Sequence, residues 1–237
     1  MTSLLHVDSS HSGDSVSKRL TALFADVWRA RNGTAGYTYR DVFAEPVPMV
    51  SPAYVALGTR VERHGVVPLE KVHALVEGAD EEREWALTLP LIKELRSADT
   101  LLVGAPMYNY SVTTALKAWI DRFSFPGAFA DPDTGAKLLR GTRVVIVTAR
   151  GGAYGPGAPR EGLDFQEPYL RGYFGNLGVE DLRFVHAEFT RAADIPALHA
   201  FQDDREASLT AAREAVTELA AYAVTSPACV TTRSTKP

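Results

Sequence analysis

Short runs of apolar residues alternate along this chain with longer segments in which apolar residues recur every three or four positions. The short runs are typical of buried β-strands, and the longer segments are typical of helices that bury one face. Strands are predicted in this way at residues 4–7, 36–42, 101–103, 144–148 and 182–187. Helices are predicted at residues 16–28, 79–98, 112–123, 165–174 and 204–224, with shorter helical pieces at 53–62 and 69–76.

The regular alternation of strands and helices predicts an α/β fold with one doubly wound parallel sheet. We expect a single domain over residues 1–224 and a disordered tail over 225–237. Residues 45–79 are rich in proline and are expected to form a long connection, as a lid or an interface. If the strand order is 2-1-3-4-5, the loops that follow the first, third and fourth strands meet at one edge of the sheet.

The first of these loops, Ser9–Ser17, is small and polar and leads into a helix. Its hydroxyls and the free N–H groups of a helix N-terminus favour an anion such as phosphate. It contains neither a Walker loop nor a Gly-x-Gly-x-x-Gly pattern, and a solvated capping loop is the alternative.

The other two loops are suited to a flat ligand. Pro106–Tyr110 combines aromatic surface with the amide of Asn109, and the glycines of Ala149–Tyr154 allow a close approach of backbone N–H groups. Taken singly, each loop could be an ordinary turn. Together, a phosphate site and a site for a planar ring describe a mononucleotide, and FMN fits best.

The segment APMYNYSVTTALKAWID at residues 105–121 resembles the signature of the FMN-dependent NADH azoreductases. This is a flavodoxin-like family that also reduces quinones. Ser9–Ser17 is similar to its phosphate loop, ARGGAY at 149–154 to its Ser-Arg-Gly-Gly segment, and residues 168–178 to a further conserved stretch of the family. Tyr110 stands where the family usually has phenylalanine, Ala149 replaces a serine, and Tyr154 replaces the histidine of some members.

The resemblance implies a flavodoxin-like sheet of order 2-1-3-4-5, FMN as cofactor, and NADH or NADPH as electron donor. It implies a quinone or azo compound as acceptor, two-electron ping-pong turnover and a homodimer. Asn109 and Tyr110 are expected to orient the substrate. The residues expected to bind the cofactor are Ser9, Ser15, Val16, Ser17, Pro106, Met107, Tyr108, Asn109, Tyr110, Ala149, Arg150, Gly151, Gly152 and Tyr154.

Charge, hydropathy and cysteine content exclude several other classes of protein. A formal net charge of −4 argues against nucleic acid as the main partner, because no surplus of basic residues is available to neutralise phosphates. No apolar run approaches the ~20 residues that a membrane-spanning helix needs. One cysteine, Cys229, excludes a disulfide framework and a cysteine-based metal site, and a cytoplasmic location is expected.

Two alternatives to the reductase remain at this point. A flavodoxin-like electron carrier would bind FMN without oxidising NADH, and a regulatory protein could keep the fold without flavin. A metal site at His186 and Glu188 lacks an evident third ligand, and a hydrolase built on Ser111 lacks an assignable base. The three tryptophans, Trp28, Trp85 and Trp119, lie on apolar helix faces and are expected to pack in the core and not to stack on a flavin.

Overall fold

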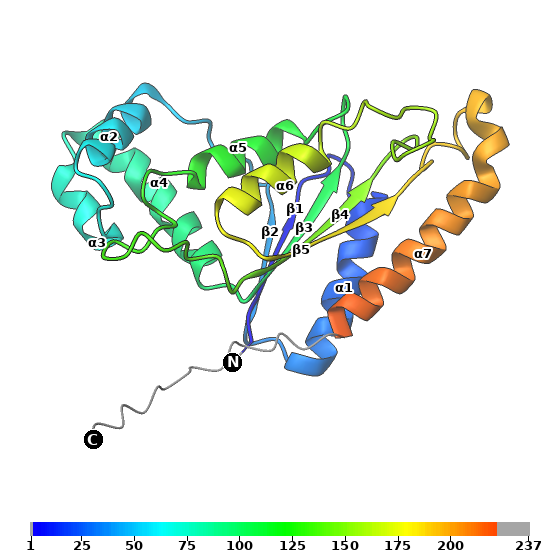
Figure 1. Cartoon of the computed structure of the whole chain (residues 1–237), viewed down its shortest axis with the longest axis horizontal. Coiled ribbons are helices and arrows are strands. Elements are labelled where there is room, and N and C mark those ends of the chain that lie inside the picture. Colours follow the sequence, from blue (N-terminus) through cyan, green and yellow to red (C-terminus); the bar gives the residue numbers. More distant parts are fainter. Residues whose placement is uncertain (1, 222–237) are drawn as a thin grey trace, which may run out of the picture.

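The computed structural model describes residues 2–221 and contains a five-stranded, all-parallel sheet (Figure 1). The strands are β1 (Leu4–Asp8), β2 (Tyr37–Asp41), β3 (Thr100–Pro106), β4 (Arg143–Ala149) and β5 (Asp181–Ala187). Their order across the sheet is β2-β1-β3-β4-β5. The predicted fold class and strand order are therefore confirmed.

The helices of the described residues connect the strands and follow the last one. They are α1 (Val16–Asn32), α2 (Pro52–Arg63), α3 (Leu69–Val72), α4 (Ala79–Arg96), α5 (Thr114–Phe123), α6 (Glu167–Asn176) and α7 (Gln202–Ala221), with the 3-10 helices η1 (His73–Leu75) and η2 (Pro196–Phe201). Both helical pieces expected in the 45–79 connection are present. The tail predicted at 225–237 lies outside the described residues.

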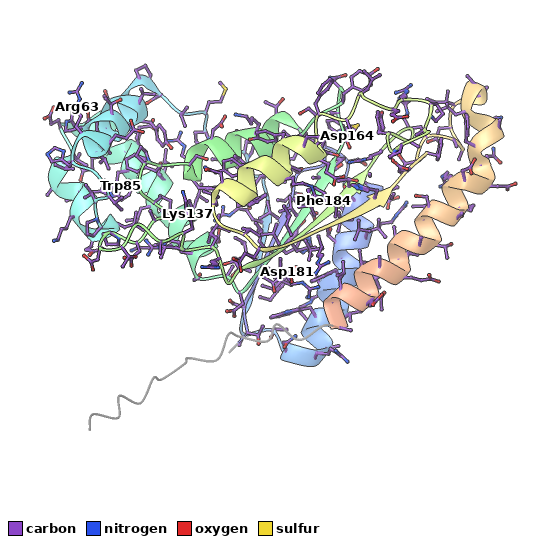
Figure 2. All side chains as sticks on the ribbon, viewed as in Figure 1. Arg63, Trp85, Lys137, Asp164, Asp181 and Phe184 are labelled. Atoms are coloured by element: carbon purple, nitrogen blue, oxygen red, sulfur yellow. The ribbon has the colours of Figure 1, made fainter. Side chains whose placement is uncertain are left out.

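Helices cover both faces of the sheet, and the three central strands β1, β3 and β4 are buried almost throughout (Figure 1). On one face, α1 and α7 pack with Leu4, Leu102 and Val145. On the other face, α2, α4, α5 and α6 enclose a larger core. The tryptophans Trp28, Trp85 and Trp119 are all buried, as expected, and Figure 2 shows Trp85 among the helices farthest from the sheet.

Strand β3 extends further than its apolar run indicates. The predicted strand ends at residue 103, but residues 104–106 continue it and pair with Val147, Thr148 and Ala149 of β4. The backbone of Gly104 and Ala105 is buried between two strands, so sheet pairing outweighs the weak strand propensity of the sequence Gly-Ala-Pro. Pro106 ends the strand and carries the following loop directly from the sheet edge.

A buried arginine attaches the irregular start of the 45–79 connection to α5. Arg122 has no exposed side-chain surface and donates hydrogen bonds to the carbonyls of Pro48 and Met49 at 2.7 to 3.2 Å. It also forms an ion pair with Glu84 of α4. Its guanidinium carbon lies 5.4 Å from the centre of the Tyr54 ring. One side chain therefore joins α2, α4, α5 and the connection.

Replacing Gly104 by alanine should destabilise the sheet by about 2 kcal/mol or more. A methyl group at this position would overlap Oδ1 of Asp8, a buried carboxylate that accepts a hydrogen bond from Thr21 at 2.9 Å. Denaturant unfolding measures the loss. Gly172→Ala is the matched control, because a methyl group there meets open space in α6 and should raise stability by up to about 1 kcal/mol. Equal stability of the two variants would contradict the prediction.

Candidate functional site

Three strand ends converge on one cleft at the carboxyl edge of the sheet. Asp8 at the end of β1 pairs with Gly104 of β3, and Pro106 at the end of β3 pairs with Ala149 of β4. Chain order reverses between β1 and β3, and in open α/β sheets such a reversal creates a crevice for ligands. The loops that follow β1, β3 and β4 line a cleft of about 840 Å³.

Most of the residues predicted from the sequence lie on the wall of this cleft. These are Ser15, Val16, Pro106, Met107, Tyr108, Asn109, Tyr110, Ala149, Gly151 and Tyr154. The prediction that these three loops meet at one edge of the sheet therefore agrees with the cleft, which most of their candidate residues line.

Four of the candidates do not line the cleft, for identifiable reasons. The hydroxyl and the backbone N–H of Ser9 both donate to the Gly104 carbonyl, which turns this residue into the sheet edge. Ser17 is buried beside Ser15, with 3.2 Å between the hydroxyl oxygens. Gly152 is buried behind Gly151, and the Arg150 side chain is enclosed by carboxylates. Any contribution of these four residues to ligand binding must be through the backbone or through support of neighbours.

The N-terminus of α1 forms one end of the cleft. Ser15 is the N-cap residue, and its hydroxyl oxygen accepts a hydrogen bond from the N–H of Lys18 at 3.2 Å. The N–H groups of Val16 and Ser17 lie in the first turn, where no helical carbonyl four residues earlier can accept a hydrogen bond from them. No acidic residue lies in the first turn of α1, all of whose residues are among those that the structure describes. This helix end is therefore electropositive and suited to an anion.

The loop after β3 is a tight turn that presents two polar side chains. The backbone groups of Tyr108 and Ser111 form two mutual hydrogen bonds of 3.0 and 3.1 Å. Between them, Asn109 and Tyr110 both have positive φ angles, 48° and 70°, as in a type I′ turn. Asparagine tolerates this conformation, whereas tyrosine adopts it rarely and at a cost in energy. Such strain is frequent at ligand-binding positions.

Aromatic rings surround this turn. The Tyr110 ring lies edge-on to that of Tyr154, with 6.3 Å between centres, and the Tyr108 hydroxyl forms a hydrogen bond with Nδ1 of His11. His11 is in turn 6.1 Å from the Phe43 ring. Flat apolar surface therefore lies between the electropositive end of α1 and the glycines after β4.

A buried charge cluster supports the loop after β4. The Arg150 guanidinium lies 2.9 Å from a carboxylate oxygen of Asp164, with Glu167 and Glu188 within 4 Å. Nε2 of His186 lies 2.9 Å from the Glu167 carboxylate, and its Nδ1 lies 2.8 Å from the Thr148 hydroxyl. Burial and the nearby Arg150 charge lower the pKa of His186, although Glu167 opposes them.

The lowered pKa of His186 should make the fold less stable in acid. The unfolded chain takes up a proton near the ordinary histidine pKa of 6.5, while the folded state resists protonation until a lower pH. This contribution is constant above the ordinary pKa and is lost progressively as pH falls from there through the folded-state pKa. Thermal unfolding across that range should give a flatter pH dependence for His186→Asn than for the native chain. A parallel pair of curves would contradict the assignment.

Several lining residues were not among the sequence candidates. They are Ser10, His11, Ser12, Asp14, Arg160, Thr190, Arg191 and Asp194. The first four belong to the predicted loop and could have been included by position. The others come from irregular segments after β4 and β5, where no periodicity indicates which side chain faces the sheet edge.

Within residues 2–221, no cluster of three or more histidine, cysteine or acidic side chains could hold a metal ion. Among the helices in that range, none is both long and apolar enough to cross a membrane.

A five-stranded sheet of this order, with a ligand-sized cleft at its β1/β3 reversal, defines a flavodoxin-like protein. A family model described as flavodoxin-like fold matches residues 2–218. The chain belongs to this family.

Relatives within the family carry specific names. The chain is 40% identical to an FMN-dependent NADH:quinone oxidoreductase of Nocardia farcinica, covering 88% of this chain and 93% of that protein. It is 36% identical to one of a Parafrankia species, covering 93% and 100%. A solved azoreductase from Bacillus anthracis superimposes with a TM-score of 0.75 at 20% identity, covering 93% and 99% of the two chains. The resemblance inferred from residues 105–121 is thereby confirmed.

Proposed function

We propose that this protein is an FMN-dependent NADH:quinone oxidoreductase that also accepts azo or related flat aromatic compounds. The observation that carries the proposal is the single cleft with an electropositive helix end, an aromatic turn and a glycine loop on its walls. Relatives that are 36 to 40% identical over most of the chain are named for this activity, which favours an enzyme over an electron carrier or a flavin-free protein.

The residues of the cleft suit FMN. A volume of about 840 Å³ lies within the usual range for cofactor sites, roughly 300 to 1,000 Å³. The N–H groups of Val16 and Ser17 and the Ser15 hydroxyl would hold the phosphate. Residues 106–110 would contact the flat ring system, with Ala149, Gly151 and Tyr154 at its other edge. The flavin supplies two-electron hydride chemistry when bound.

The chain itself binds and orients the reactants. The Asn109 amide and the Tyr110 hydroxyl are presented at the cleft wall by the strained turn, where they can donate hydrogen bonds to a carbonyl or azo nitrogen of the acceptor. Tyr110 is 38% exposed, so part of its surface is open to a ligand that enters the cleft. Donor and acceptor use the same cleft in turn, which gives ping-pong kinetics.

Replacing Tyr110 by phenylalanine should raise the KM for quinones about fivefold, the worth of one neutral hydrogen bond. Flavin content should not change, because the ring and the turn are retained. Steady-state kinetics with a simple benzoquinone measures the effect. Tyr169→Phe, a change in α6, is the matched control, and equal KM values for both variants would remove Tyr110 from substrate orientation.

The proposed activity is tested with the purified full-length protein. It should be yellow or become so with added FMN, bleach with NADH under nitrogen, and recolour when a quinone is added. A yellow protein that NADH does not bleach would be a carrier. A colourless protein that takes up no FMN would leave only the flavin-free alternative.

We also propose a homodimer formed through the face that bears the cleft. Large apolar side chains are exposed there, including Phe43 beside His11 and Phe165, whose N–H donates to the Tyr110 carbonyl at 3.0 Å. Met49, in the connection held by Arg122, is 79% exposed. Exposed apolar groups of this size often mark protein interfaces. Light scattering should give a dimer mass for the native chain and for Leu87→Lys, and a monomer mass for Met49→Lys/Phe165→Lys.

We further propose a cytoplasmic location for this activity. NADH is regenerated inside cells, and a reductase that depends on it needs access to that supply. Fractionation of the cells that produce the protein, followed by an assay of NADH-dependent quinone reduction, tests the location. Activity confined to an extracellular fraction would contradict it.

A further inference from the structure

Two arginines line the cleft and have no place in the cofactor site described above. Arg160 follows the glycine loop after β4, and Arg191 follows β5. Both side chains belong to the wall formed by the segments after β4 and β5, whereas the α1 N-terminus belongs to the loop after β1. The cleft therefore has a second electropositive region, made of guanidinium groups rather than helix N–H groups.

The glycine loop is shaped to accommodate both arginine stems. A methyl group on Gly151 would lie 3.3 Å from Cδ of Arg191, and one on Gly152 would lie 3.5 Å from Cδ of Arg160. A side chain at Gly151 would thus press on the Arg191 stem, which would have to shift by a few tenths of an ångström, whereas one at Gly152 would only contact Arg160. The absence of side chains at both positions lets the arginines lie against the loop backbone.

Arg191 is held in place by its neighbours. The N–H and the hydroxyl of Thr190 both donate to the Arg150 carbonyl, at 3.0 and 2.9 Å. Phe189 has a positive φ of 52°, and its ring stacks on Phe201 with 4.9 Å between centres. A phenylalanine in this conformation is strained, and such strain persists only where the surroundings impose it. The turn that carries Arg191 is therefore fixed on both sides.

Among residues 2–221, no carboxylate neutralises either guanidinium. Arg160 donates to the Tyr154 hydroxyl at 3.3 Å, and no carboxylate of residues 2–221 lies within ion-pair distance of Arg160 or Arg191. Arg150, only a few residues from both, has three carboxylates around it. Asp194 is the acidic residue on the same wall, so the two arginines leave a net positive charge there.

We infer that Arg160 and Arg191 form a cationic subsite that binds an anionic group of the molecule reacting in the cleft. A carboxylate, sulfonate or phosphate presents the oxygens that guanidinium groups bind best. This inference rests on the proposed function and adds a substrate class to it. The anionic group has two possible sources, the acceptor and the diphosphate of the nicotinamide donor.

The test compares Arg160→Gln/Arg191→Gln with Arg63→Gln in the FMN-loaded protein. Glutamine retains a hydrogen-bonding side chain and removes the charge. Arg63 is an exposed arginine at the end of α2, and Figure 2 shows it at the left end of the molecule, well away from Asp164, which pairs with Arg150 beside the cleft. The acceptors are 1,4-naphthoquinone and its 2-sulfonate, and the donors are NADH and a dihydronicotinamide without phosphate. Binding of anthraquinone-2-sulfonate, measured by calorimetry, gives a readout independent of turnover.

If the acceptor supplies the anion, the double variant should raise the KM for the sulfonate and the Kd for anthraquinone-2-sulfonate about tenfold, with the neutral quinone unchanged. If the donor supplies it, the KM for NADH should rise by the same factor, with the phosphate-free donor unchanged. Added salt should weaken either preference in the native protein.

The inference is overturned if neither anionic substrate distinguishes the double variant from Arg63→Gln. It is also overturned if the double variant loses FMN affinity tenfold, because the arginines would then belong to the cofactor site. In both cases the native protein would still reduce quinones. Failure of the proposed function would instead appear as a native protein without flavin or without NADH-dependent activity.

Discussion

Ser15→Asp should weaken FMN binding about 100-fold while leaving the fold intact. Aspartate caps a helix as well as serine does, so the hydrogen bond from the Lys18 N–H is retained. The added carboxylate, however, lies where the phosphate is expected. Two like charges about 4 Å apart repel by about 1 kcal/mol in bulk water and by about 4 kcal/mol near a protein surface, and a site at the open end of a cleft lies between these limits, at about 2.7 kcal/mol.

Quenching of flavin fluorescence with apoprotein gives the dissociation constants. Ser15→Asn is the control, because it caps the helix without a charge and should bind FMN within a few fold of the native chain. Riboflavin, which lacks the phosphate, should bind Ser15→Asp almost as well as it binds the native protein. If riboflavin and FMN lose affinity equally, the phosphate does not lie at the N-terminus of α1.

Arg122→Met should destabilise the protein by about 3 to 5 kcal/mol. The substitution leaves the buried Glu84 carboxylate without its partner and removes the donors to the carbonyls of Pro48 and Met49. Denaturant unfolding measures the loss.

Two further variants separate charge from packing. Arg122→Met/Glu84→Gln should recover part of the loss, because no unpaired buried charge remains. Arg83→Met breaks an exposed ion pair with Asp80 in the same helix as Glu84 and should cost less than about 1 kcal/mol. Equal stability of Arg122→Met and Arg83→Met would show that burial of the Arg122 pair has no energetic consequence.

Elements defined by local pattern were predictable from the sequence. The runs that became β1, β3 and β4 are short and mostly apolar, as is typical of strands buried on both faces. The positions of polar and glycine-rich loops directly after these strands were enough to bring Ser15, Asn109 and Gly151 to one cleft. Parallel strands end at a common edge of the sheet, so a loop that directly follows a strand must lie at that edge.

Features defined by tertiary contacts were not predictable. The sequence gives no sign that the Ser9 hydroxyl turns away from the cleft, because its acceptor is Gly104, distant in the chain. Arg122 lies in a helix whose apolar spacing does not include it, and its burial depends on carbonyls from the 45–79 connection. Arg160 and Arg191 reach the cleft from irregular segments whose course is set by hydrogen bonds such as that from Thr190 to Arg150.

The two-residue turn after β3 closes through backbone groups of Tyr108 and Ser111 alone. Neither the side chain at position 109 nor the one at position 110 contributes to that closure, but both positions have a left-handed backbone, which asparagine tolerates better than tyrosine does. A residue that tolerates this backbone, such as asparagine or glycine, would therefore stabilise the turn at position 110 and would remove the tyrosine hydroxyl from the cleft wall. Stability of the turn and orientation of the acceptor would thus favour different residues at position 110.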